Sequence, residues 1–183
     1  MAMAAPTDDE VPISFDAFLL AEAARETKHE LVDGFARAMA GASWRHGATA
    51  ANITSLVLRQ ARDQGCQAFA SDMLVRIGDR GYYPDVLVAC GGGSDDRFTT
   101  EPCLIVEVLS PSTTSIDRGE KLKAYRSIPS VETYLIVDAA ARSIEVYQRA
   151  GDLWTYAEVS EDAVIDLTCP RMQMHVGDVF DGV

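Results

Sequence analysis

The sequence lacks both the apolar runs of a membrane protein and the leader of a secreted one. None of its apolar stretches approaches the roughly 20 residues of a membrane-spanning helix. Residues 1–10 hold acidic side chains and no basic one, which excludes a standard signal peptide. We therefore expect a cytoplasmic protein with no membrane partner.

Basic residues are also scarce. The chain of 183 residues has 16 Lys and Arg against 28 Asp and Glu, which gives a formal net charge of −12. Proteins that bind nucleic acids usually carry a basic surplus, because contacts to phosphate supply much of their affinity. Any nucleic-acid function must therefore depend on a local site and not on the overall charge.

Motifs for zinc binding, serine catalysis and phosphate binding are absent as well. No G-x-S-x-G elbow predicts a serine nucleophile. The glycines at 91–93 lack the Lys-Ser or Lys-Thr that follows a phosphate loop. The cysteines are widely spaced, form no C-x-x-C pair and have no histidine close by, which favours buried thiols over disulfides or zinc ligands. They are Cys66, Cys90, Cys103 and Cys169.

The order of the predicted elements indicates an α/β or α+β fold with a mixed central sheet flanked by helices. We expect a disordered tail over residues 1–12 and a single domain over 13–183. Capping residues and hydrophobic periodicity predict the elements of that domain. They are helices from Ser14, over 43–64 and over 115–127, a hairpin at Asp33-Gly34, extended chain over 66–77, a turn over 78–81, and strands over 85–90, 103–109, 133–138, 143–148 and 153–159.

Glu107 is the unusual residue of this pattern, because it lies in the middle of the apolar run 103–109. An unpaired ionised carboxylate in such a strand costs several kcal/mol unless a cation or a metal balances it. Asp85 begins the preceding apolar strand. If the two strands are neighbours, both carboxylates can reach one ion, and hard oxygen ligands suit magnesium or manganese. In the alternative reading, Glu107 pairs with a Lys or Arg and Asp85 only caps a turn.

Asp117, Lys121 and Tyr125 follow at positions i, i+4 and i+8 of the predicted helix, which places them on one helical face. In one interpretation Lys121 points its ammonium toward the carboxylate pair, where it orients a water and stabilises charge on a phosphate. In the other, Asp117 and Lys121 form an ordinary surface ion pair and Tyr125 is half-buried. The spacing is compatible with both.

Several segments, taken in order, resemble the Uma-type family of bacterial proteins, which are themselves similar to restriction endonucleases of the PD-(D/E)-x-K superfamily. The resemblance spans roughly Ser14 to Phe180. The segments are HELVDG at 29–34 with the later His46, YPDVLV at 83–88, LIVEVLSPST at 104–113, the Asp117, Lys121 and Tyr125 series, and VETYLIVD at 131–138.

This resemblance implies a magnesium- or manganese-dependent endonuclease that hydrolyses DNA. Asp85, Glu107 and the backbone carbonyl of Val108 would hold the metal, and Lys121 would orient the attacking water. Glu30 matches a glutamate that faces the same site in many relatives and serves as a further candidate ligand.

One departure from the superfamily pattern concerns the lysine. The position two residues after Glu107 is Leu109, so the resemblance assigns the ammonium to Lys121 on the next helix. His46, Asp117 and Tyr125 are accessory candidates, and His46 is about equally well explained as a capping or surface residue.

Two functions follow for the chain. The first is the DNA endonuclease. The second is a nuclease-like scaffold with little or no catalysis that acts in binding or assembly; the charge of −12 favours it, while the carboxylate within an apolar strand favours the enzyme. A homodimer is a further expectation, with an edge strand among residues 143–159 as the contact.

Overall fold

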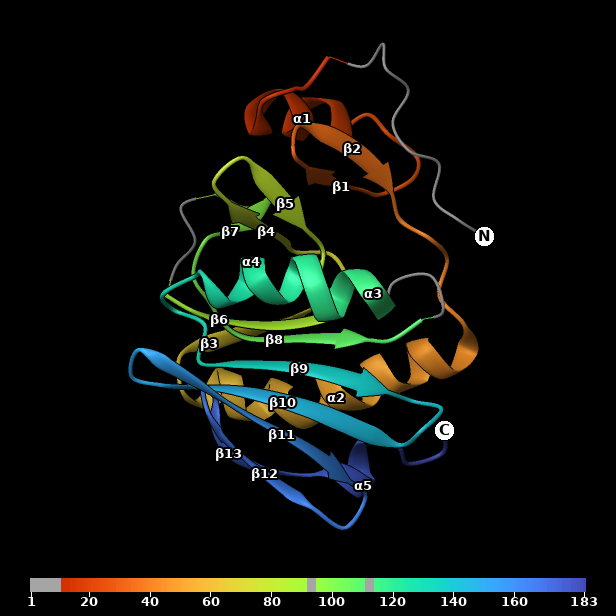
Figure 1. Ribbon diagram of the computed structural model, residues 1–183, viewed down its shortest axis with the longest axis vertical. Helices are drawn as coiled ribbons and strands as arrows, with labels where there is room; N and C mark the ends of the chain where they lie inside the picture. The colour runs from red at the N-terminus through yellow and green to blue at the C-terminus, as the bar shows by residue number, and fades with distance from the viewer. Residues whose placement is uncertain (1–10, 92–94, 111–113) are drawn as a thin grey trace.

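The central sheet has six strands in the order β11-β10-β9-β8-β6-β3 (Figure 1). The computed structural model describes residues 11–91, 95–110 and 114–183. Within this six-stranded sheet only β8 and β9 are parallel and the other neighbours are antiparallel, so the predicted mixed α/β fold is confirmed. The strands are β3 (Cys66–Ala70), β6 (Val86–Cys90), β8 (Pro102–Val108), β9 (Thr133–Asp138), β10 (Ser143–Ala150) and β11 (Leu153–Ser160).

A second sheet of five strands stands beside the first, in the order β2-β1-β5-β4-β7. Its hairpin turns at Asp33 and Gly34, which have φ values of 52° and 88°, as the Asp-Gly pair predicts. The turn predicted over 78–81 is shorter, because β5 already begins at Arg80. The strands are β1 (His29–Val32), β2 (Phe35–Ala38), β4 (Leu74–Ile77), β5 (Arg80–Tyr82) and β7 (Phe98–Thr99), and α1 (Phe15–Glu22) packs beside them.

The segment 66–77 was predicted as extended chain, and it forms two strands with a break between them. Its two halves belong to different sheets, β3 to the six-stranded sheet and β4 to the five-stranded one. Ser71 lies between them with a φ of 54°, and its backbone N–H donates to the carbonyl of Asp85. A left-handed residue in the middle of a run ends a strand, and the weak alternation of the sequence does not reveal it.

Helix α2 (Trp44–Asp63) covers one face of the six-stranded sheet. The Ser43 side chain caps its first turn, and Gly65 follows its end with a φ of 75°, where the sequence predicted the helix to stop. Ile53 and Val57 are fully buried against the sheet. The burial of this apolar stripe therefore fixes the position of α2, including its first turn, relative to the sheet.

The other face of the sheet is covered by α3 (Thr114–Ile116), a π-helical segment η1 (Asp117–Lys121) and α4 (Leu122–Arg126). The predicted helix over 115–127 is present, with a π-helical turn in it that the sequence did not indicate. Tyr125 of α4 is fully buried between Tyr82 of the second sheet and Tyr134 of β9. This helical segment therefore lies between the two sheets (Figure 1).

The C-terminal part adds a two-stranded sheet that the sequence did not predict. Strands β12 (Val164–Thr168) and β13 (Arg171–His175) pair with each other, and α5 (Val176–Val179) follows. Only alternate residues of these short strands are buried, Ile165 and Leu167 on β12 and Met174 on β13. Such short alternation resembles polar loop sequence, which explains why it was missed.

The four cysteines form two disulfides, Cys66–Cys90 and Cys103–Cys169, so the prediction of buried thiols is wrong for this structure. Cys66 and Cys90 are directly opposite on paired strands. Wide spacing in the sequence did not reveal this, because strand register and not sequence distance decides which side chains meet.

Strand β11 forms one edge of the six-stranded sheet, so an edge strand exists where the homodimer contact was expected. The homodimer itself stays a prediction. No helix within the described residues is long and apolar enough to cross a membrane. Residues 1–10 of the predicted tail lie outside the described residues, and the backbone of Ile13 already donates to the carbonyl of Gly34. The single domain over 13–183 also stays a prediction.

Candidate active site

Strand register brings Asp85 and Glu107 together. In the antiparallel pair of β6 and β8, Val86 lies opposite Val106. When this register is continued by one residue, Asp85, which directly precedes β6, lies opposite Glu107. Directly opposed residues on antiparallel strands point to the same face, with Cβ atoms roughly 5 Å apart. The predicted neighbouring strands are therefore confirmed, and their register sets the two carboxylates side by side.

Asp85 is held by a hydrogen bond at each oxygen. Its Oδ2 accepts from the backbone N–H of Val108 at 2.7 Å, and its Oδ1 lies 2.8 Å from Nε2 of His46. His46 stands in the first turn of α2, where its own backbone N–H donates to Ser43. The hydrogen bond to Asp85 raises the pKa of His46 above its ordinary value. The capped first turn of α2 therefore positions the His46 ring beside Asp85.

Glu107 is 4% exposed and is held by two donors. Nζ of Lys121 lies 3.0 Å from its Oε1, and the hydroxyl of Tyr125 donates to the same oxygen at 2.9 Å. Burial raises the pKa of the Tyr125 phenol well above its ordinary value, and neighbouring Glu107 adds to this. Tyr125 therefore stays protonated and donates. Both of these contacts end on Oε1.

Lys121 joins the two sheets through its charge. Its Nζ lies 2.9 Å from Oε1 of Glu30 on β1 and 3.7 Å from Oδ1 of Asp117. The same Glu30 oxygen accepts the backbone N–H of Tyr83 at 3.2 Å. Lys121 is therefore a buried ammonium among three carboxylates and not an exposed partner of Asp117, which removes the surface-ion-pair reading.

Negative charge exceeds positive charge around Glu107. Burial raises the pKa of Glu107 well above its ordinary value; Lys121 opposes this, and the carboxylates of Asp85, Asp117 and Glu30 add to it. Burial by itself lowers the pKa of Lys121, yet its three carboxylate neighbours outweigh that effect and raise it. The surrounding carboxylates therefore raise both pKa values, adding to the effect of burial at Glu107 and opposing it at Lys121.

The predicted ligand residues border a common cavity of about 670 Å³. Its wall includes Glu30, His46, Asp85, Glu107, Val108 and Lys121. Asp117 and Tyr125 do not line it and act on the site from behind, through Lys121 and Glu107. Of the candidate residues, the structure thus brings six to one cavity and places two beneath it.

Arg37 is a cavity residue that the sequence analysis missed. It lies opposite Glu30 in the β1–β2 hairpin, and its guanidinium lies 3.3 Å from Glu120, which also lines the cavity. The signal was present, because an Asp-Gly turn fixes the hairpin register and so pairs position 30 with position 37. Lys28 at the mouth of the cavity was missed as well.

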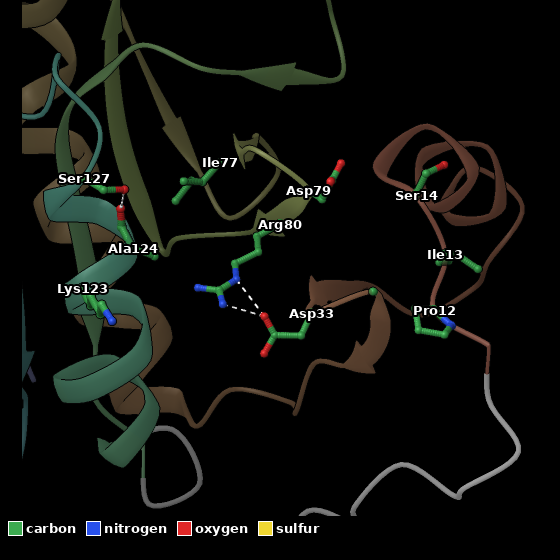
Figure 2. Close-up of a pocket in the computed structure, with 11 residues that line it drawn as sticks. Pro12, Ile13, Ser14, Asp33, Ile77, Asp79, Arg80, Lys123, Ala124 and Ser127 are labelled. Atoms are coloured by element: carbon green, nitrogen blue, oxygen red, sulfur yellow. Dashed lines mark hydrogen bonds and ion pairs between the residues drawn. The ribbon is translucent and has the colours of Figure 1, made fainter.

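A second cleft of about 630 Å³ lies between the hairpin and α4 (Figure 2). Its Arg80 is bound by Asp33 at 2.5 Å, and Lys123 lies on its far wall. None of the candidate site residues lines this cleft. The chemistry therefore concentrates in the first cavity.

A divalent ion fits the donor set of the first cavity. Asp85 and Glu107 supply hard oxygens, and the surplus of carboxylates favours a cation. Within the described ranges, no three Asp, Glu or His side chains lie within 4.8 Å of one another. Magnesium suits such a site, because it commonly takes one or two carboxylates and keeps several waters. Glu30 lines the same cavity with its Oε1 in contact with Lys121, and its role as a further ligand stays a prediction.

Residues 15–176 match the family model Uma2, described as "Putative restriction endonuclease". Two proteins of Synechocystis sp. are similar: "Uncharacterized protein slr1290" is 34% identical over 76% of this chain and 76% of its own length, and "Uncharacterized protein sll1609" is 33% identical over 82% and 90%.

A solved structure shares the fold. The crystal structure of "a putative nuclease belonging to DUF820" from Anabaena variabilis superimposes with a TM-score of 0.74 over 93% of this chain and 98% of that one. Only 19% of the residues are identical, so the likeness concerns the fold alone.

Proposed function

The chain belongs to the Uma2 family, and we propose that it is an endonuclease that hydrolyses DNA phosphodiester bonds with magnesium or manganese. The observation that carries the proposal is the pair of opposed carboxylates, Asp85 and Glu107, at a cavity that also receives the ammonium of Lys121. When bound, the divalent ion supplies Lewis acidity toward the phosphate.

Asp85 and Glu107 are the proposed ligands, with the carbonyl of Val108 as a third. The backbone N–H of Val108 and the ring of His46 fix the orientation of Asp85. Tyr125 and Lys121 fix Oε1 of Glu107, and the other oxygen is the proposed ligand of the ion. Ligands that are oriented by such neighbours lose little freedom when the ion binds.

Lys121 is the proposed partner of the attacking water and of the charge that grows on the phosphate. Its pKa is raised, so it keeps its proton and acts as a fixed positive charge and hydrogen-bond donor, not as a base. Glu30 holds Lys121 from the opposite sheet, and Asp117 holds it from the preceding turn. These contacts position the ammonium at the cavity.

Arg37 and Lys28 also line the cavity, and we propose that they contact the phosphate backbone of an entering DNA strand. Basic side chains at the cavity are few, and the chain has a net charge of −12. Affinity for DNA must therefore come from the ion and from these few basic residues. The scarcity favours the second candidate, a nuclease-like binding module with weak or no catalysis.

Plasmid nicking in manganese decides between the two candidates. We expect the wild-type chain to cleave, and the isosteric variants Asp85→Asn and Glu107→Gln to be at least about 100-fold slower. Asp63→Asn, on an exposed part of α2, is the matched control and should cleave at the wild-type rate. Equal traces of cleavage by the wild type and Glu107→Gln would point to a contaminant and support the binding module.

A further inference from the structure

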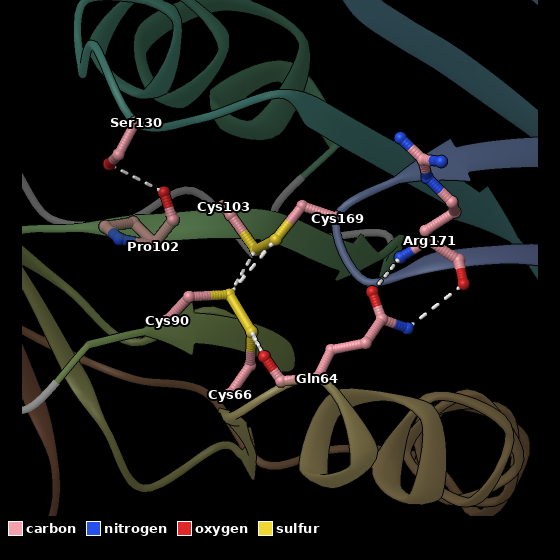
Figure 3. Close-up of a disulfide and its surroundings, with 8 residues drawn as sticks. All are labelled: Gln64, Cys66, Cys90, Pro102, Cys103, Ser130, Cys169 and Arg171. Carbon is pink, nitrogen blue, oxygen red and sulfur yellow. Dashed lines mark hydrogen bonds between the residues drawn. A yellow bond between two sulfur atoms is a disulfide. The ribbon is translucent and has the colours of Figure 1, made fainter.

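Four sulfur atoms gather on the other face of the six-stranded sheet (Figure 3). Within the two disulfides they are bonded, and between them the gap is small: Sγ of Cys90 lies 3.2 Å from that of Cys169 and 3.6 Å from that of Cys103. No other side chain fits between atoms at these distances. The two disulfides therefore make one cluster of sulfur.

Strand geometry brings three of these cysteines to the same face. Cys66 lies opposite Cys90 in the β3–β6 pair, so their side chains share a face. On β8, the register with β6 shifts after Leu104, and Cys103 is the residue left without an opposite partner. Such a bulge re-aims a side chain that strict alternation would send to the opposite face. Cys103 thereby joins the cluster.

The fourth cysteine arrives on the turn between β12 and β13. Gln64, which caps the end of α2, holds this turn through Arg171, the first residue of β13. Its Oε1 accepts the backbone N–H of Arg171 at 2.8 Å, and its Nε2 donates to the Arg171 carbonyl at 3.1 Å. Figure 3 shows Cys169 beside Cys103, with its sulfur bonded to that of Cys103 and turned toward Cys90. Residues from four separate segments thus converge through specific contacts.

The surroundings of the cluster are apolar but accessible. Cys66 and Cys103 are buried, while Cys90 and Cys169 are half-buried at the end of the hydrophobic core. Solvent, a reductant or an ion therefore reaches the cluster from the side of Cys90 and Cys169. Within the described residues, Cys66, Cys90 and Cys169 are the one set of three metal-ligating side chains with mutual distances within 4.8 Å.

We propose that these four cysteines, when reduced, bind one zinc ion or a similarly soft divalent cation as a tetrathiolate site. Zinc–sulfur bonds of roughly 2.3 Å in a tetrahedron place the sulfurs about 3.8 Å apart. The present separations of 3.2 Å and 3.6 Å between the disulfides are close to that spacing. Cleavage of the two S–S bonds frees the paired sulfurs to take the same spacing.

The reaction balances with a dithiol as reductant. Each disulfide takes up two electrons and two protons from one dithiol, which is itself oxidised to a disulfide. The four thiols then release their protons to solvent as four zinc–sulfur bonds form. A thiol-reducing compartment, which the sequence predicts, favours the zinc-bound form. The disulfide form is the oxidised, zinc-free state of the same four residues.

The chemistry of the ligands separates this site from the candidate active site. Thiolates select zinc and other soft cations, whereas the carboxylates of Asp85 and Glu107 select magnesium or manganese. Cys90 lies five residues after Asp85 along β6, which corresponds to roughly 17 Å of extended strand. Each site can therefore be tested while the other is disabled.

The test is a cobalt(II) titration of the full-length chain, reduced and kept free of oxygen, with cobalt as the spectroscopic substitute for zinc. We expect one cobalt per chain with intense thiolate-to-cobalt charge-transfer absorption, and its loss when zinc is added. The Asp85→Ala variant should give the same spectrum. Cys103→Ser and Cys169→Ser should lose the charge-transfer absorption or weaken it strongly. No such absorption in the reduced wild type, or an unchanged spectrum in both cysteine variants, would overturn the proposal.

A second readout uses the wild-type chain, in case a cysteine variant fails to fold. Zinc should protect all four thiols of the reduced protein from alkylation, counted by mass spectrometry. The oxidised protein, titrated with cobalt, should show no thiolate-to-cobalt charge-transfer absorption, because its cysteines are closed as disulfides. Alkylation of the four thiols at equal rates with and without zinc would contradict a tetrathiolate site.

Discussion

Strands β6 and β8 carry two clusters of opposite chemistry at their two ends. At one end, Asp85 and Glu107 face the helical segment and are surrounded by charge. At the other end, Cys90 and Cys103 face α2 and lie within sulfur and hydrocarbon. One pair of strands thus presents hard oxygen donors on one face and soft sulfur donors on the other.

The two clusters differ in what holds them. The carboxylates depend on a buried ammonium, because an unpaired buried charge is very unfavourable. The cysteines are compatible with the apolar core in any protonated or bonded form and need no counter-charge. We therefore expect the first cluster to respond to changes of charge and the second to changes of redox state. A change in one cluster should have little effect on the other.

The largest expected effect is at Lys121. Lys121→Met leaves Glu107 and Glu30 buried without their ammonium, and it should lower the free energy of unfolding by about 3–5 kcal/mol. Lys123→Met changes an exposed lysine two residues away and should stay within about 0.5 kcal/mol of the wild type. Urea denaturation measures both. A loss below 1 kcal/mol for Lys121→Met, or equal losses in the two variants, would mean that the charges are not buried as described.

The disulfides give the next effect. The double variant Cys103→Ala/Cys169→Ala should lower the unfolding free energy of the oxidised chain by about 2–4 kcal/mol. The matched double variant Cys66→Ala/Cys90→Ala removes the disulfide that closes the shorter loop, with a separation of 24 residues against 66. Its loss of unfolding free energy should therefore be roughly 1 kcal/mol smaller. Denaturation of both variants under non-reducing conditions tests the order, and the reverse order would contradict it.

A smaller effect is expected at Tyr125. Tyr125→Phe removes one buried hydrogen bond to Glu107 and should destabilise the chain by about 1.5–3 kcal/mol. Tyr156→Phe, on the exposed edge strand, is the control and should change nothing measurable. The oxidised and reduced chains should lose the same amount at Tyr125. A loss that depends on redox state would show that the two clusters are coupled through the strands.

The smallest effect is expected at Gln64. Gln64→Ala breaks both hydrogen bonds to Arg171 and should destabilise the chain by about 0.5–1.5 kcal/mol. It should also weaken cobalt binding by the reduced chain, because the turn that carries Cys169 is then less firmly placed. Gln67→Ala, exposed on β3, serves as the control. Unchanged cobalt affinity in Gln64→Ala would remove that positioning role.

The sequence revealed the first cluster because charge is conspicuous in an apolar strand. Glu107 interrupts the run 103–109, and the run itself predicts a buried strand. Helix α2 and the Asp-Gly hairpin were also predictable, because their signals lie within short stretches of the sequence. The resemblance added Glu30 and assigned a role to Lys121. In the structure Lys121 contacts both Glu30 and Glu107.

The second cluster was hidden because its signal is entirely non-local. A bulge re-aims Cys103, the β3–β6 register pairs Cys66 with Cys90, and Gln64 holds the turn of Cys169. None of these features leaves a spacing motif in the sequence, and cysteine in an apolar run looks like any other core residue. The split of residues 66–77 between two sheets was hidden for the same reason.

The central claim is that Asp85 and Glu107 form one site for a hard divalent ion, and manganese binding measured by calorimetry tests it most directly. The oxidised chain is the sample of choice, because its cysteines are then closed as disulfides. We predict one manganese ion per chain for the wild type and loss of this binding in both Asp85→Ala and Glu107→Ala. Manganese affinity that is the same in the wild type and in both variants would contradict the account.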